Sequence, residues 1–263
     1  MTANNTANVK QWLEQSDIDY FTHFVKAWIP FNAWYRHIYT FEHENDILNK
    51  IKTDGNKIRT RFMATIVKDD PDSVEIRNQI AALHRRLSID PLEDRKKRSI
   101  SFENVCVGRN ANNKEILCYY GCIYSVERQN KPVKQIVCSL ANKSGVVKST
   151  IIQLGEWDLE GIQTHADYLA LQPNDRARIL ACYKQANPYI FRSLLAVATD
   201  SCTLQMDSYK FEHDPAAIFA GLLDVLYAMR NLLFHGELVP DPQTNRTYEP
   251  AYHLVRYLTR FIT

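Results

Sequence analysis

Three side chains near the end of one apolar segment have the types needed for acid–base chemistry on a phosphate. They are Arg230, Asn231 and His235, in the run YAMRNLLFHG that spans residues 227–236. Histidine can take up or release a proton near neutral pH, and a guanidinium can hold phosphate oxygens with two parallel hydrogen bonds. These types suit cleavage of RNA by attack of a ribose 2′-OH on the adjacent phosphorus. Such a reaction needs no metal ion, because its nucleophile belongs to the substrate.

The spacing of these residues sets a condition on the site. Tyr227, Asn231 and His235 are four residues apart and therefore form one row along a helix, where Asn231 would orient the imidazole or the phosphate. Arg230 and His235 are five residues apart, which separates them by roughly 140° on an ideal helix. The length of arginine and an irregular last turn would have to bring them together. The alternative is a helix end at which His235 contacts the terminal carbonyls and Arg230 is a solvated charge.

The same residues resemble a known motif. RNLLFH (230–235) resembles the R-N-x-x-x-H motif of the HEPN superfamily, helical-bundle proteins many of which are ribonucleases. The stretch FVKAWIPFNAWYR (24–36) is similar to the aromatic first helix of several HEPN groups found beside prokaryotic defence and toxin genes. The resemblance covers the helical parts of the chain, roughly residues 9–98 and 156–263.

This resemblance implies an RNA substrate, no cofactor, and a homodimer in which Arg230 and His235 of both protomers form one composite cleft. The expected products are a 2′,3′-cyclic phosphate and a 5′-hydroxyl. A regulatory or antitoxin partner would fit a defence or toxin system. Toxins of the superfamily that are silenced by nucleotidylation carry a tyrosine two residues after the histidine, where this chain has Glu237, so control by that enzyme is not expected. The alternative is an inactive HEPN module that binds RNA, a nucleotide or a protein partner.

The apolar pattern predicts a mainly α chain: a HEPN-like helical bundle with an inserted antiparallel β-meander, α+β overall. Helical parts are expected at 1–98 and 156–263, with the meander at 99–155. Apolar residues recur at helical spacing in 17–39, where Pro30 predicts a kink or an interruption near Ile29, and in 44–67, where Gly55 is a weak point.

Capping residues mark the other expected helices. A third helix would end at Leu87, and a fourth would occupy 173–185. The longest lies at 214–236, between Asp214–Pro215 and Gly236, and a last amphipathic helix follows. The proposed N-caps are Ser73 or Asp72 for the third helix and Asn174 or Asp175 for the fourth.

Between residues 99 and 155 the period changes to the alternation typical of strands. ILCYYGCIYSV (116–126) alternates throughout, which predicts one strand. With ISFENVCVG before it and PVKQIVCSL and VVKSTIIQL after it, the pattern predicts a meander of about four strands. Polar turns separate these strands at 109–114, 128–132 and 141–145.

Two groups of basic residues are candidates for RNA contact. RKKR, which comprises Arg95, Lys96, Lys97 and Arg98, is the densest and has Arg85 and Arg86 upstream; it is either a phosphate-contacting edge or a solvated connector. In a four-strand meander, the first and third turns share one end. That arrangement would bring together Arg109, Lys114 and Lys143.

The aromatic residues of the first helix are expected to pack in the core rather than to stack on bases. They are Trp28, Phe31, Trp34 and Tyr35. Asn32 among them is either a buried amide bonded to the backbone near Pro30 or a partner of the motif. The sequence leaves both readings open.

Composition and motifs argue against several other classes. The net charge of +2 requires any nucleic-acid contact to come from a local patch. The N-terminus does not read as a secretory signal, no apolar run approaches the roughly 20 residues of a membrane span, and six scattered cysteines suit a reducing cytoplasm.

Metal binding is not expected from the sequence. Cys118 and Cys122, if on one strand, would lie about 13 Å apart, too far to share zinc. His37 and His43 have no partner at ligand spacing, and neither HExxH, paired CxxC, a P-loop nor a dinucleotide fingerprint occurs.

Overall fold

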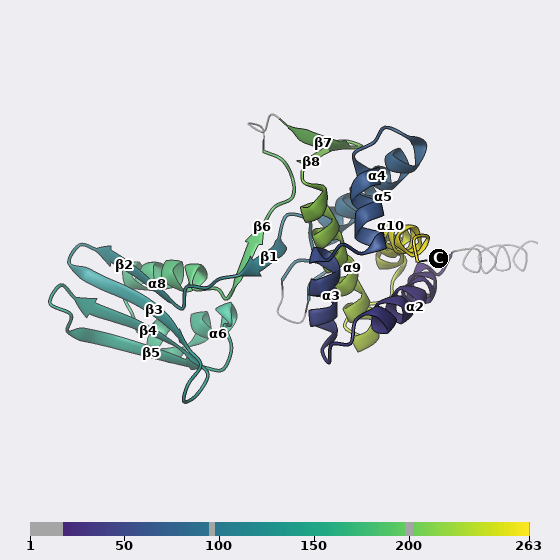
Figure 1. Cartoon of the computed structure of the whole chain (residues 1–263). Helices are drawn as coiled ribbons and strands as arrows, with labels where there is room; N and C mark the ends of the chain where they lie inside the picture. The colour runs from purple at the N-terminus through teal and green to yellow at the C-terminus, as the bar shows by residue number, and fades with distance from the viewer. Residues whose placement is uncertain (1–17, 95–97, 198–201, 263) are drawn as a thin grey trace, which may run out of the picture. The chain divides into compact units, whose positions relative to one another are not determined.

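The computed structural model describes residues 18–94, 98–197 and 202–262 of this mixed α+β chain. The chain divides into two compact units (Figure 1). Unit 1 comprises Met1–Val105 and Arg192–Thr263, and unit 2 comprises Cys106–Phe191. Each unit has a separate apolar core.

Unit 1 is built from helices and one small hairpin. The helices are α2 (Tyr20–Ile38), α3 (Glu44–Thr53), α4 (Lys57–Ile66), α5 (Pro71–Ile89), α9 (Pro215–His235) and α10 (Pro242–Thr259). Strands β7 (Thr203–Met206) and β8 (Tyr209–Glu212) form the hairpin. Helix α9 packs against α3 and α4, while α10 packs against α2 and α5.

Helix α9 has the bounds that its sequence predicts. Asp214 Oδ1 accepts a hydrogen bond of 3.0 Å from the Ala217 N–H, and Pro215 occupies the first turn. Gly236 ends the helix with a left-handed φ of 65°, a conformation that glycine adopts without steric cost.

Helix α9 departs from the prediction that no apolar run approaches the length of a membrane span. By length and composition, this helix of 21 residues could cross a membrane. A buried core helix passes the same test, and nine residues of α9 are buried in unit 1. They are Ile218, Phe219, Gly221, Leu222, Leu223, Val225, Leu226, Met229 and Leu232.

The other helices of unit 1 depart from their predicted bounds. Helix α2 runs through Pro30 without interruption, because its buried aromatic side chains hold both halves against the core. The helix predicted over 44–67 is divided into α3 and α4, and Asn56 caps α4 by accepting a hydrogen bond of 2.9 Å from the Arg59 N–H. The N-cap of α5 is Asp70 rather than Ser73 or Asp72.

Unit 2 is a four-stranded antiparallel sheet with helices against one face. The strand order is β2 (Lys114–Tyr119), β3 (Cys122–Gln129), β4 (Gln135–Asn142) and β5 (Val147–Leu154). The helices are α6 (Leu159–Thr164), α7 (Ala166–Leu169) and α8 (Pro173–Gln185). The predicted N-caps of α8 are wrong, since Gln172 precedes its first turn.

The meander is present, but its strands differ from those predicted. Residues 116–126 form a hairpin rather than one strand, because Tyr120 and Gly121 make a two-residue turn with φ of 43° and 75°. The first predicted strand becomes β1 (Val105–Arg109), which pairs with β6 (Tyr189–Arg192) in a separate two-stranded sheet.

The inserted unit is also longer than the predicted 99–155. Tyr183 and Cys182 of α8 are buried with sheet residues in the core of unit 2. The indole N–H of Trp157 donates a hydrogen bond of 3.0 Å to the Tyr183 carbonyl. Because this packing joins α6–α8 to the sheet, the unit extends to Phe191, and the boundary expected at 155/156 falls inside it.

We expect unit 1 to fold without unit 2. Unit 2 leaves and re-enters unit 1 at two chain segments that lie side by side, since the Leu194 N–H donates a hydrogen bond of 2.9 Å to the Phe102 carbonyl. Replacing residues 106–191 by a short Gly-Ser linker should preserve the helical circular dichroism. Cooperative thermal unfolding should also remain, with a midpoint shift below about 4 °C, which corresponds to roughly 1 kcal/mol in a domain of this size. Phe219→Ala in the shortened chain is the control, because loss of this core ring should lower the midpoint clearly. A broad, non-cooperative transition in the parent would contradict the prediction.

Candidate functional site

The C-terminal half of α9 carries the motif at the surface of unit 1. Arg230 and Asn231 are partly buried, and the Arg230 side chain is 18% exposed. His235 in the last turn is exposed, as is Phe234 beside it. The motif end is therefore accessible to solvent within unit 1.

The guanidinium of Arg230 is held by three neighbours. Its Nη1 donates a hydrogen bond of 2.9 Å to Asn231 Oδ1 and lies 3.4 Å from Oε2 of Glu44. The ring centre of Phe234 lies 4.3 Å from the guanidinium carbon, a distance at which the ring face attracts the cation. The Nε atom of Arg230 is buried and has no hydrogen-bond partner among the described residues.

Glu44, in the first turn of α3, is the shared acceptor of this cluster. The Tyr35 hydroxyl donates to its Oε1, and the Tyr227 hydroxyl donates to its Oε2 at 3.3 Å. Arg36 Nη2 lies 4.0 Å from Oε1. Helices α2, α3 and α9 thus contribute side chains to one carboxylate. Its position at a helix N-terminus also favours negative charge.

Both tyrosines remain protonated donors at neutral pH. Burial raises the pKa of Tyr35 and of Tyr227 above the ordinary range, and the negative charge of Glu44 raises each pKa further. A phenol in this state can donate to Glu44 but cannot accept a proton as a base. The two hydroxyls therefore hold the carboxylate in place.

The aromatic residues of α2 pack in the core of unit 1, as predicted from the sequence. Trp28, Phe31 and Tyr35 are at most 2% exposed. Phe31 packs edge-on against Trp28 and Tyr35, with ring centres 5.2 and 5.3 Å apart. Trp34 is partly buried against the same core.

The side-chain oxygen of Asn32 in α2 accepts neither of the two hydrogen bonds considered for it. Its Oδ1 is buried and has no hydrogen-bond partner in the part of the chain that the structure describes. It therefore accepts no bond from the backbone near Pro30 or from the motif. A buried carbonyl oxygen without a donor destabilises the fold unless a donor from outside reaches it.

The Arg230 guanidinium is turned toward Glu44. No side-chain hydrogen bond or ion pair of His235 is found within the described ranges. A five-residue spacing separates two side chains by roughly 140° on an ideal helix.

The RKKR group can be placed only in part. Arg95, Lys96 and Lys97 lie outside the described residues. Arg98 forms an ion pair with Asp94 in unit 1. The positive charge of Arg98 also stabilises the charged form of Asp224 in α9. Burial raises the pKa of Asp224, whereas the ion pair with Lys52 and, more weakly, Arg98 lower it.

The three basic residues expected at one end of the sheet do not lie together. Lys114 starts β2, where its Nζ is 3.2 Å from Oε2 of Glu127. Lys143 follows Asn142, which pairs with Cys122 at the opposite end of the sheet. The hairpin at residues 120–121 reverses the chain once more than predicted, which separates the two lysines. Arg109 belongs to β1, outside this sheet. The prediction of a joint cluster is wrong.

Among the described residues, no group of three or more His, Cys, Asp or Glu side chains is placed to hold a metal ion. Cys118 and Cys122 lie on neighbouring strands rather than on one strand. Glu44 could not be predicted as part of the site, because one acidic residue at the start of a helix does not indicate a distant partner.

Glu44→Gln should test the arrangement of the cluster. Loss of the carboxylate charge leaves the partly buried guanidinium of Arg230 without its counter-charge. We expect the free energy of unfolding in urea to fall by about 1.5–3 kcal/mol, the contribution of a hydrogen bond to a charged group. Glu42→Gln, two residues away and exposed, is the matched control and should change it by less than about 0.5 kcal/mol. Equal effects of the two substitutions would show that Glu44 does not hold Arg230.

Comparisons with protein-family models, with curated proteins and with solved structures found no match to this chain. What the site does must therefore be inferred from its own residues and their contacts.

Proposed function

We propose that this protein is a metal-independent endoribonuclease of the HEPN type. It cleaves RNA by attack of the 2′-OH and leaves a 2′,3′-cyclic phosphate and a 5′-hydroxyl. The observation that carries the proposal is the R-N-x-x-x-H sequence at the capped, solvent-exposed end of a central helix. The helices of unit 1 would correspond to the HEPN bundle, with unit 2 as an insertion.

Each motif residue has a separate role in this proposal. His235, which is exposed, transfers protons to or from the reacting oxygens. Arg230 stabilises the negative charge that develops on the phosphorane. Asn231 accepts the hydrogen bond from Arg230 Nη1, so its role is to orient the guanidinium rather than the imidazole.

A second copy of the chain would complete the site. A five-residue spacing directs Arg230 and His235 to different sides of one helix, so the proposal pairs His235 of one copy with Arg230 of the other across a two-fold axis. Phe234 is 52% exposed and Val239 is 73% exposed, on either side of His235 in the chain. These apolar side chains suit the proposed dimer interface.

The cell context is part of the same proposal. A role in prokaryotic defence or as a toxin follows from the HEPN resemblance, together with a regulatory or antitoxin partner. All six cysteines are free, which suits a reducing cytoplasm.

A non-catalytic HEPN module is the second candidate, and one observation favours it. Glu44 already neutralises Arg230, and the Nε of Arg230 is buried. A module of this kind would bind RNA, a nucleotide or a protein at the motif without cleaving it. Recovery of intact RNA from a complex with wild-type protein would support this candidate.

His235→Ala should lower the rate of RNA cleavage in EDTA by at least about 100-fold, because general acid–base catalysis contributes that much or more. The circular dichroism and the unfolding midpoint should stay unchanged, since the side chain is exposed. His213→Ala, which removes another exposed histidine of unit 1, is the control and should cleave like wild type. Undiminished cleavage by His235→Ala would remove the assignment.

The composite site can be tested by mixing two inactive variants. His235→Ala and Arg230→Ala should each be inactive alone, but their mixed dimer retains one histidine and one arginine from different protomers. We expect cleavage to reappear after the two are denatured and refolded together. Absence of cleavage in a mixture that contains the mixed dimer would contradict a site that needs only one histidine and one arginine from different protomers.

A further inference from the structure

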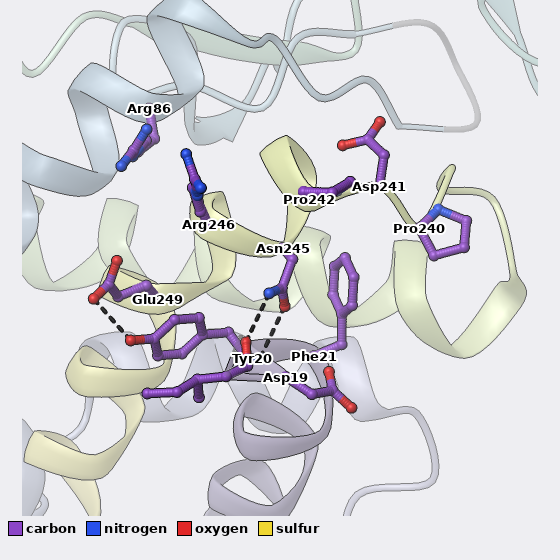
Figure 2. A pocket seen from close by; sticks show the side chains of 11 residues that line it. Asp19, Tyr20, Phe21, Arg86, Pro240, Asp241, Pro242, Asn245, Arg246 and Glu249 are labelled. Carbon is purple, nitrogen blue, oxygen red and sulfur yellow. Dashed lines mark hydrogen bonds between the residues drawn. The ribbon is translucent and has the colours of Figure 1, made fainter. Parts of the chain in front are cut away.

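A groove in unit 1 is separate from the cluster around Glu44. It lies between the N-terminal ends of α2 and α10 and the C-terminal part of α5, and its volume is about 780 Å³ (Figure 2). Pockets that hold small ligands have volumes of roughly 300–1,000 Å³. The residues that give it polar character are Tyr20, Arg86, Asn245, Arg246 and Glu249.

The three carboxyl groups of the groove accept hydrogen bonds within unit 1 from groups that carry no charge. Asp19 Oδ1 accepts from the Thr22 N–H at 3.1 Å, and Asp241 Oδ1 accepts from the Thr244 N–H at 2.7 Å. Each aspartate thereby caps a helix. Glu249 Oε1 accepts a hydrogen bond of 2.8 Å from the Tyr20 hydroxyl.

The two arginines have no such partners. Arg86 of α5 and Arg246 of α10 both line the groove, and Figure 2 shows them on the same side of it, with the Tyr20 ring on another side. Within residues 18–94, 98–197 and 202–262, neither guanidinium forms an ion pair or hydrogen bond. By contrast, the adjacent Arg85 pairs with Asp207 at 3.4 Å. An anion in the groove would be attracted by both guanidiniums.

We propose that this groove binds the phosphate of a nucleotide, supplied either by a free nucleotide or by an RNA strand. Two guanidiniums from different helices can hold one phosphate through several charged hydrogen bonds. The Tyr20 ring, fixed through its hydroxyl by Glu249, offers a face on which a base can stack. Binding does not require the cleavage proposed above, so the two proposals can fail independently.

The position of the groove along the chain suits either source. Pro240, which lines the groove, follows His235 by five residues, so their Cα atoms lie at most about 18 Å apart. An RNA strand whose scissile phosphate lies at the end of α9 could therefore place a phosphate a few nucleotides away in this groove. A free nucleotide would occupy the groove on its own.

Binding titrations on the full-length His235→Ala chain test the proposal without interference from cleavage. The probes are adenosine 5′-monophosphate, adenosine, and a fluorescent 2′-O-methyl oligoribonucleotide. We expect at least one phosphate-bearing probe to bind. Arg86→Gln or Arg246→Gln should then weaken that binding by about tenfold or more, the loss of one charged hydrogen bond. Arg256→Gln, on the same helix as Arg246 but outside the groove, should leave binding unchanged.

The pattern across probes distinguishes the two sources. Binding of the mononucleotide indicates a free nucleotide, and binding of the oligonucleotide alone indicates an RNA strand. The proposal is overturned if neither phosphate probe binds at millimolar concentration, or if adenosine binds as tightly as its monophosphate. Equal effects of Arg256→Gln and the two groove variants would overturn it as well.

Discussion

Burial of α9 in the core of unit 1 is the constraint on which the site depends. A helix whose buried residues face the core through most of its length can present charged side chains only near its end, unless a partner compensates them. Arg230 lies in the C-terminal half of α9, and its side chain is only 18% exposed. The Glu44 carboxylate provides the compensation from α3, and two tyrosines from α2 and α9 hold that carboxylate. Side chains from three helices therefore meet at one carboxylate.

Local signals explain which elements could be predicted from the sequence. Asp214 and Gly236 bound α9 through interactions within a few residues, so its ends were predicted correctly. The hairpin at Tyr120–Gly121 was missed because the alternation of apolar residues continues across a two-residue turn. The packing of α8 on the sheet was missed for a different reason. It depends on contacts between residues that are distant in sequence, such as the hydrogen bond from the Tyr124 hydroxyl to Asp175 of α8.

The residues of the candidate site also fall into two groups, those that local spacing indicates and those that only the tertiary structure brings together. Arg230, Asn231 and His235 could be selected because they lie on one short segment with a recognisable spacing. Glu44 is separated from Tyr227 by 183 residues, so only the tertiary structure could bring it to the motif. Lys114 and Lys143 were grouped from an assumed number of strands, and one unforeseen reversal of the chain was enough to separate them. A prediction that depends on counting strands is therefore less secure than one that depends on spacing within a helix.

The contacts of Glu44 also bear on how Arg230 could act on a phosphate. A phosphodiester carries a negative charge and would compete with Glu44 for the guanidinium. Loss of a partner is costly for a partly buried carboxylate when nothing else satisfies it. Glu44 would still accept hydrogen bonds from Tyr35 and Tyr227, and the raised pKa of both phenols keeps them protonated. The two tyrosines thus reduce the cost of transferring Arg230 from Glu44 to a substrate, so the ion pair in the free protein is compatible with a catalytic arginine.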